Sequence, residues 1–200
     1  MIILGLTGSI GMGKTVAAGM LRRLGLPVHD ADRTVHRLLA PGGKAVAAVA
    51  AIFPSAFKDG GIDRGELGRL VFADRVALHR LEAILHPLVR AEERRFLALQ
   101  RRRRAAMAVL DIPLLFETGG EKRCDAVIVV SAPAFLQAAR VLARPGMTAA
   151  RLALILAKQL PDVEKRRRAD YVVPTGQGQR LTRRRLQAVI QSFRKNRCAK

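Results

Sequence analysis

Short apolar runs, separated by segments with helical spacing, organise this chain. The runs Ile2–Thr7, Ala106–Asp111 and Ala126–Ser131 are bounded by polar or turn residues, as buried parallel strands usually are. Pro27–Asp30 and Tyr171–Val173 predict two shorter strands. Apolar residues recur at helical spacing between and after these runs, on one face with Leu152, Ile155 and Leu156 and on another with Leu186, Val189, Ile190 and Phe193. Alternating strands and helices predict an α/β fold with a parallel sheet of about five strands flanked by helices.

One long stretch interrupts this alternation. Residues 33–100 contain no predicted strand, only helix-like segments such as Arg80–Leu85 and Leu88–Leu99, separated by Pro87. We therefore expect a helical insertion between the second and third strands. Ligands of such folds bind at the carboxyl ends of the strands, so an insertion here is expected to overhang that edge and to hold a second substrate.

A smaller break at Arg144–Met147, which contains Pro145 and Gly146, ends one helix before another begins near Thr148. A short helix pair of this kind resembles a lid, and we assign it to residues 140–160, the lid segment. Arg140 and Arg144 are spaced to share a helix face. Together with Arg151 they are candidates to close on a bound anion, although each alone fits a solvated arginine.

Composition narrows the class of protein. The 200 residues are 50% hydrophobic, enough for one substantial core, so residues 1–200 are predicted to form a single domain with these additions. No apolar run approaches the roughly 18 residues of a membrane span, and a soluble, cytoplasmic protein is expected, as a monomer or a weak homo-oligomer. Cys124 and Cys198 lie far apart and lack metal-ligand spacing, which indicates free thiols.

The formal net charge of +20 allows two kinds of partner. Lysine and arginine neutralise the phosphates of nucleic acids, and a positive cleft also attracts small, highly anionic substrates. The runs Arg101–Arg104, Lys165–Arg168 and Arg183–Arg185 each adjoin a helical pattern and each fit a solvated face. Aromatic residues are only 4% of the chain, which leaves few platforms for base stacking, so nucleic acid is not the expected partner.

The segment Gly8–Thr15 carries the most specific chemistry. It matches G-x-x-x-x-G-K-[ST] directly after the first strand and before a helical pattern, the context of a phosphate-binding loop (P-loop). Backbone N–H groups converge on phosphate oxygens in such a loop, the lysine reaches the β- and γ-phosphates, and the threonine hydroxyl binds Mg²⁺. The predicted fold is thus that of a P-loop NTPase. The predicted ATP-binding residues are Gly8, Ser9, Ile10, Gly11, Met12, Gly13, Lys14, Thr15 and Val16.

Other residues favour a kinase. GTPases of this class usually read guanine with N-K-x-D, and the chain's sole Asn is Asn196, near its C-terminus. A kinase needs a carboxylate near the acceptor hydroxyl, and Asp30 and Asp32 follow the second strand. An extended chain would place both on one side, whereas a helix starting there would make one its cap. Asp111, which ends the third strand, is a candidate Mg²⁺ ligand beside Thr15 or a plain strand-terminal aspartate.

Several motifs in order resemble the dephospho-CoA kinase family. The chain has the family's G-L-T-G-x-I-G-x-G-K-[ST] at Gly5–Thr15, D-A-D at Asp30–Asp32, H-P at His86 and Pro87, and D-x-P-L-L-[FY]-E at Asp111–Glu117. The family pattern continues with an arginine-bearing lid, a glutamine and an A-D-[YF]-V-[IV] strand. In this chain the glutamine is Gln159, and the strand motif is Ala169–Val173. The chain departs from the pattern at Pro174, Thr175 and Gly176, where many members have an Asn before the Gly.

The resemblance implies that Mg-ATP phosphorylates the ribose 3′-hydroxyl of dephospho-CoA, the last step of coenzyme A biosynthesis. Carried over by residue, Asp32 looks like the base, and Lys14 and Arg140 look like the groups that stabilise the transferred phosphoryl. The acceptor pocket would include His86, Pro113, Leu114 and Leu115, although His86 also fits a packing histidine. Two alternatives remain: a kinase of the same architecture that acts on a nucleoside or nucleotide, and a nucleic-acid-binding ATPase.

Overall fold

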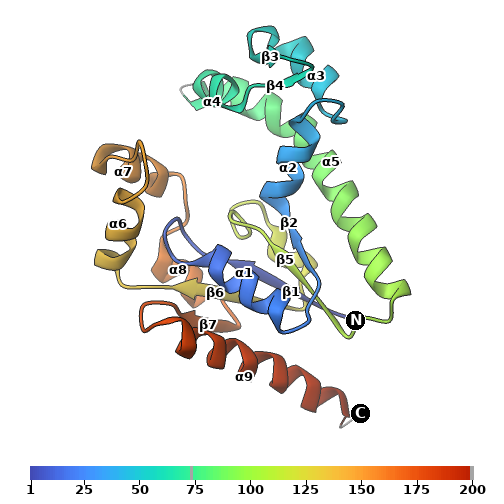
Figure 1. The fold of residues 1–200 in the computed structure, drawn as a ribbon, viewed down its shortest axis with the longest axis vertical. Coiled ribbons are helices and arrows are strands. Elements are labelled where there is room, and N and C mark those ends of the chain that lie inside the picture. The colour runs from blue at the N-terminus through green and yellow to red at the C-terminus, as the bar shows by residue number, and fades with distance from the viewer. Residues whose placement is uncertain (73, 199–200) are drawn as a thin grey trace. The chain divides into compact units, whose positions relative to one another are not determined.

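The computed structural model describes residues 1–72 and 74–198 (Figure 1). It divides into two compact units, one formed by Met1–His29 and Gln100–Lys200 and the other by Asp30–Leu99. The first unit contains the main sheet, and the second is mostly helical.

The main sheet confirms the predicted α/β class. Its five strands are β1 (Ile2–Thr7), β2 (Val28–Asp30), β5 (Met107–Asp111), β6 (Ala126–Ser131) and β7 (Tyr171–Pro174). They lie in the order β2-β5-β1-β6-β7, and β1 pairs in parallel with both β5 and β6. Because the chain leaves β1 toward β2 on one side and later returns to β6 on the other, the order reverses beside β1. In open α/β sheets, ligands bind at such a reversal, outside the carboxyl ends of the strands.

Alternate side chains of the strands enter different layers of the core. Leu4 and Leu6 of β1 and Ile128 of β6 are fully buried with residues of α1 (Lys14–Arg23) and α9 (Gln179–Cys198). On the other side, Val127 and Val129 pack against the segment after β5, which contains Leu115 and Phe116. Both faces of the sheet are therefore covered, as the continuous apolar runs of a parallel sheet require.

The remaining helices of this unit follow β6. They are α6 (Ala134–Leu142), α7 (Ala149–Ala157) and α8 (Asp162–Arg167), and a short 3-10 turn, η2 (Gly120–Arg123), precedes β6. The break predicted near Arg144 is confirmed: α7 begins after Thr148, whose hydroxyl caps it by accepting the Arg151 N–H at 3.2 Å. Within the described residues, no helix combines the length and the apolar character needed to cross a lipid bilayer.

The helical unit is built from α2 (Ala31–Leu39), α3 (Val46–Ile52), η1 (Pro54–Ala56), β3 (Phe57–Lys58), β4 (Gly61–Ile62), α4 (Arg64–Phe72) and most of α5 (Arg75–Arg102). It has a core of its own, in which Leu38, Val49, Phe53, Leu67 and Leu81 are buried. A separate core indicates that this unit holds its own shape.

Two features of the helical unit differ from expectation. No strand was predicted in it, but β3 and β4 form an antiparallel hairpin of two residues each, turned through Asp59 and Gly60 with φ of 49° and 76°. The predicted separation at Pro87 is also wrong, because α5 runs through this residue. Proline removes one helical hydrogen bond, yet Leu85 before it and Leu88 after it both pack into the core, which keeps the helix continuous.

Candidate active site

The phosphate loop connects β1 to α1 in a conformation that only glycine accepts easily. Gly11 and Gly13 have φ of 77° and 85°, the left-handed region that other residues rarely adopt. A Cβ at Gly11 would lie 2.6 Å from Val141 Cγ2, and one at Gly8 would lie 2.6 Å from Val130 Cγ2. The spacing of these glycines therefore reflects both backbone conformation and the close approach of β6 and α6.

The N-terminus of α1 is suited to bind an anion. The first helical hydrogen bond runs from the Ala17 N–H to the Gly13 carbonyl at 3.1 Å, so the N–H groups of Lys14, Thr15 and Val16 precede the helical ladder. Among the described residues, no side chain caps this end, and the first turn contains no acid. Free N–H groups and the positive end of the helix dipole together favour phosphate.

Lys14 and Asp111 meet at the carboxyl edge of the sheet. Lys14 Nζ lies 2.8 Å from Asp111 Oδ1, and the two side chains are 15% and 3% exposed. They meet because Asp111 ends β5 opposite Leu6, close to the point where β1 enters the loop. The described residues contain no cluster of three or more histidine, cysteine or acidic side chains that could hold a metal ion alone. Mg²⁺ in nucleotide sites usually takes one or two carboxylates plus phosphate oxygens, and Asp111 with the exposed Thr15 fits that requirement.

The structure distinguishes the two aspartates that follow β2. Asp30 caps α2, since its Oδ1 accepts the Arg33 N–H at 2.9 Å. Asp32 lies in the first turn of the same helix and is exposed. The extended arrangement with both carboxylates on one side therefore does not occur. His86, the other candidate in the helical unit, is exposed on α5.

Arg140 contacts the phosphate loop directly. Its Nη1 lies 3.3 Å from the Gly11 carbonyl oxygen, and its Nη2 donates to the Thr175 carbonyl at 2.8 Å. The prediction that Arg140 and Arg144 share a helix face is wrong, because α6 ends at Leu142. Arg151 donates to the Gly146 carbonyl at 3.2 Å, inside the turn between α6 and α7. Of these three arginines, Arg140 is thus the one with a described bond to the phosphate loop.

Thr175, where the chain departs from the family pattern, is buried beside the loop. Its hydroxyl donates to the Met12 carbonyl at 2.8 Å, and its Oγ1 lies 3.2 Å from where a Cβ of Gly13 would be. The sequence did not assign this residue a role. The one sequence feature that could have pointed to Thr175 is its position directly after the last strand, at the edge of the sheet where the phosphate loop lies.

The segment after β5 is anchored by a buried ion pair, which was also not predicted from the sequence. Lys165 is fully buried, and its Nζ lies 2.8 Å from Glu117 Oε1 and 3.4 Å from the Pro113 carbonyl oxygen. The Pro113 carbonyl also accepts the Thr7 hydroxyl at 2.9 Å. The solvated-face interpretation of the run that begins at Lys165 is therefore wrong for Lys165 itself. In the same segment, Leu115 is fully buried and Leu114 is 39% exposed.

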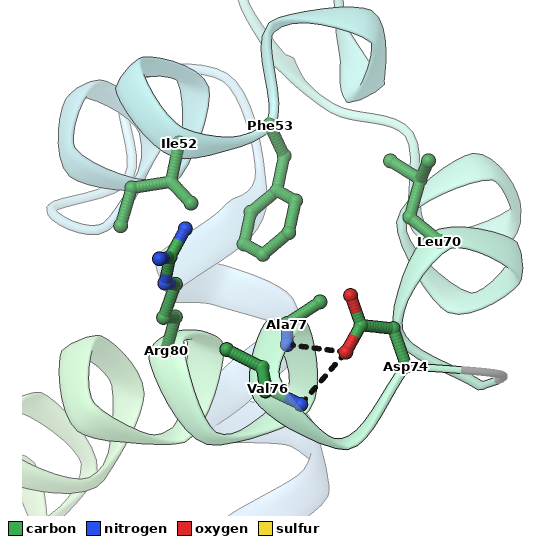
Figure 2. Close-up of a pocket in the computed structure, with 7 residues that line it drawn as sticks. All are labelled: Ile52, Phe53, Leu70, Asp74, Val76, Ala77 and Arg80. Atoms are coloured by element: carbon green, nitrogen blue, oxygen red, sulfur yellow. Dashed lines mark hydrogen bonds between the residues drawn. The ribbon is translucent and has the colours of Figure 1, made fainter.

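A separate hollow of about 410 Å³ lies in the helical unit (Figure 2). Its lining is mainly apolar: Ile52, Phe53, Leu70, Asp74, Val76, Ala77 and Arg80. Asp74 caps α5 there, because its Oδ1 accepts the N–H groups of Val76 and Ala77 at 2.7 and 3.1 Å. None of the predicted site residues lines this hollow, so it is distinct from the candidate site.

Comparison with known proteins identifies close relatives. The sequence profile of the dephospho-CoA kinase family matches residues 2–179. A dephospho-CoA kinase of Paramagnetospirillum magneticum is 72% identical over 166 residues, which are 83% of this chain and 78% of that protein. One from Mesorhizobium japonicum is 56% identical over 194 residues, 97% of this chain and 98% of that protein. The solved structure of dephospho-CoA kinase from Campylobacter jejuni superposes with a TM-score of 0.73 at 26% identity, covering 98% of both chains.

Proposed function

The chain belongs to the dephospho-CoA kinase family, and we propose that Lys14, Asp32 and Arg140 carry its reaction. The enzyme transfers the γ-phosphoryl group of ATP to the ribose 3′-hydroxyl of dephospho-CoA and gives CoA and ADP, the final step of CoA biosynthesis. The observation that supports the donor site best is the uncapped, acid-free N-terminus of α1 behind the glycine loop. The net charge of +20 suits two polyanionic substrates.

On the donor side, the N–H groups at the start of α1 hold phosphate oxygens. Lys14 reaches the β- and γ-phosphates, and its bond to Asp111 keeps its ammonium group at the edge of the sheet. Arg140 adds a second positive charge beside the loop. Such fixed cations stabilise the charge that spreads over the phosphoryl oxygens in the transition state.

We further propose Mg²⁺ as the divalent cation, with Thr15 and Asp111 as the residues that would hold it. When bound with ATP, Mg²⁺ neutralises phosphate charge. Asp111 is 3% exposed and already paired with Lys14, so this carboxylate is held in one orientation. That orientation supports a role as a direct or water-mediated ligand.

On the acceptor side, the helical insertion of residues 33–100 holds dephospho-CoA. The ribose O3′ attacks the γ-phosphorus as the bond from that phosphorus to the ADP oxygen breaks, and the hydroxyl proton passes to the Asp32 carboxylate. The exposure of Asp32 and the use of Asp30 as a helix cap support this assignment. His86, Pro113, Leu114 and Leu115 are the residues proposed to contact dephospho-CoA, on the strength of the family motifs that contain them.

A coupled ADP-release assay tests these roles. Asp32→Asn should lower kcat by about 10²- to 10⁴-fold, the usual contribution of a general base, and leave the KM for ATP within about threefold. Asp30→Asn is the matched control, because asparagine also caps helices well, and it should retain most activity. Full activity in Asp32→Asn would remove Asp32 from the mechanism. Chelation of divalent metal should abolish turnover, and added Mg²⁺ should restore it.

The sequence also predicted a cytoplasmic location and a monomer or weak homo-oligomer. Both stay predictions.

A further inference from the structure

Both hydrogen-bonding groups of one phosphate-loop residue are held by glutamine side chains. The Ile10 N–H donates to Gln159 Oε1 at 3.0 Å, and Gln137 Nε2 donates to the Ile10 carbonyl at 2.8 Å. Gln137 lies on α6, three residues before Arg140, and Gln159 lies just beyond the end of α7. Gln137 therefore lies shortly before the predicted lid segment (residues 140–160), and Gln159 lies near its end.

These contacts occur where α6 packs tightly on the loop. Gln137 is only 7% exposed. A Cβ at Gly11 would lie 3.0 Å from the backbone carbonyl oxygen of Gln137 and 3.2 Å from the Cγ of the same residue, so no spare space separates α6 from the loop. An unmade hydrogen bond is costly in such a place, because water cannot easily replace the lost partner.

The glutamines also complement Arg140. Gln137 binds the Ile10 carbonyl, and Arg140, one helical turn later on α6, binds the Gly11 carbonyl. Two successive carbonyls of the loop are thus fixed from the same helix, while the end of α7 fixes the N–H group before them. With both carbonyls turned toward α6, the N–H groups at the start of α1 are left for phosphate.

We propose that Gln137 and Gln159 are positioning residues that act through Ile10 and join α6 and the end of the lid segment to the phosphate loop. They touch neither substrate: they hold the loop in its anion-binding shape and make that shape depend on where α6 and the end of the lid segment lie. This inference rests on the proposed function, because it takes the loop to hold the phosphates of ATP.

The two contacts need opposite chemistry, which gives a charge-matched test. Glutamate in place of Gln159 still has an oxygen to accept the Ile10 N–H. Glutamate in place of Gln137 has no donor and turns a carboxylate oxygen toward the Ile10 carbonyl. Both substitutions add one negative charge near the nucleotide, so the difference between them reports the hydrogen bond and not the charge.

The experiment measures the Kd of ATP by calorimetry, and kcat and both KM values by ADP release, on the full-length protein. Gln137→Glu should raise the Kd and KM for ATP about tenfold more than Gln159→Glu, with the KM for dephospho-CoA within about twofold of the unmodified protein. Gln137→Met and Gln159→Met, which lack the added charge, should each raise the Kd for ATP about fivefold. Gln191→Glu, on the exposed side of α9, is the control for charge alone and should bind ATP normally.

Backbone hydrogen exchange serves as a second readout for any variant that loses activity. In folded Gln159→Met, exchange at residues 9–13 should be faster, while exchange in the strands is unchanged. Equal effects of the two glutamate variants on ATP binding, or unchanged loop exchange in both methionine variants, would overturn the inference. If the unmodified protein itself bound no ATP, the proposed function would fail instead, so the two failures are distinguishable.

Discussion

The buried ion pair between Glu117 and Lys165 gives a prediction with an unusual order of effects. Glu117→Gln should destabilise the protein more than Lys165→Met, and the double variant should be more stable than Glu117→Gln alone. The reason is the difference in burial: the Lys165 side chain is 0% exposed, whereas that of Glu117 is 17% exposed and also accepts the Leu160 N–H at 2.8 Å.

The structure indicates the magnitudes. In Glu117→Gln, the Lys165 ammonium stays buried without a counter-charge, beside neutral oxygens such as the Pro113 carbonyl at 3.4 Å, and loss of one charged partner of a buried pair costs about 3–5 kcal/mol. In Lys165→Met, the Glu117 carboxylate keeps the Leu160 N–H and some water, so a cost of about 1–3 kcal/mol is expected. The double variant removes both charges, so no buried charge is left unpaired, and the stability of this variant should lie within about 2 kcal/mol of that of the original protein.

Urea unfolding followed by far-ultraviolet circular dichroism measures these differences, since the chain contains no Trp for fluorescence. Glu164→Gln is the control. The same substitution there removes the negative charge from the ion pairs with Arg167 and Arg168, which are exposed, and should change the unfolding midpoint little. Additive effects of the two single substitutions in the double variant, or a Glu117→Gln protein as stable as the original, would refute the reasoning.

Two further predictions concern the loop and the helical unit. Gly11→Ala should raise the KM for ATP strongly, because the added Cβ would meet Val141 Cγ2 at 2.6 Å. Gly25→Ala is the control: Gly25 has a φ of 83° but no atom within 4 Å of an added Cβ, so this variant should lose about 1–2 kcal/mol of stability and keep the KM for ATP unchanged. Equal KM values for ATP in the two variants, measured by steady-state assays, would contradict this prediction. The Asp63 carboxylate accepts hydrogen bonds from the backbone N–H groups of Glu66 and Gly65, and these bonds hold the pKa of the carboxyl below its ordinary value. The stability that the ionised Asp63 contributes is therefore present at neutral pH and is lost as the pH falls through that lowered pKa. Asp63→Asn keeps a capping oxygen without the titration, so its urea midpoint should fall less than that of the original between about pH 5 and pH 3, and parallel curves would refute the assignment.

The sheet was predictable from the sequence because its strands are nearly continuous apolar runs. Ile2–Thr7 and Ala126–Ser131 were predicted with the bounds that the structure shows, and each of the other three strands differs by one residue at one end. The hairpin of β3 and β4 was missed because two residues per strand are too few for a period to appear. Pro87 was misjudged because local preference favours a break, whereas the core on both sides of Pro87 keeps α5 intact.

The candidate site was predictable where a motif fixes chemistry and spacing together. The loop could be recognised in this way because its glycines, lysine and threonine each have one physical task. Lys165 could not, because a lysine in a basic run looks solvated until the fold brings Glu117 to it. The contacts of Gln137 and Gln159 with Ile10 were equally hidden, since they join residues more than a hundred positions apart in sequence. Pairings of this kind depend on tertiary structure alone.

Phosphorus nuclear magnetic resonance of the reaction product tests the central claim most directly. The protein is incubated with Mg-ATP and dephospho-CoA, and in parallel with a nucleoside, a nucleotide or a polynucleotide in place of dephospho-CoA. The account predicts one new phosphomonoester signal, at the position of the 3′-phosphate of authentic CoA, formed in step with ADP and only when dephospho-CoA is present. Release of inorganic phosphate that polynucleotide stimulates, with no phosphomonoester formed on dephospho-CoA, would contradict it.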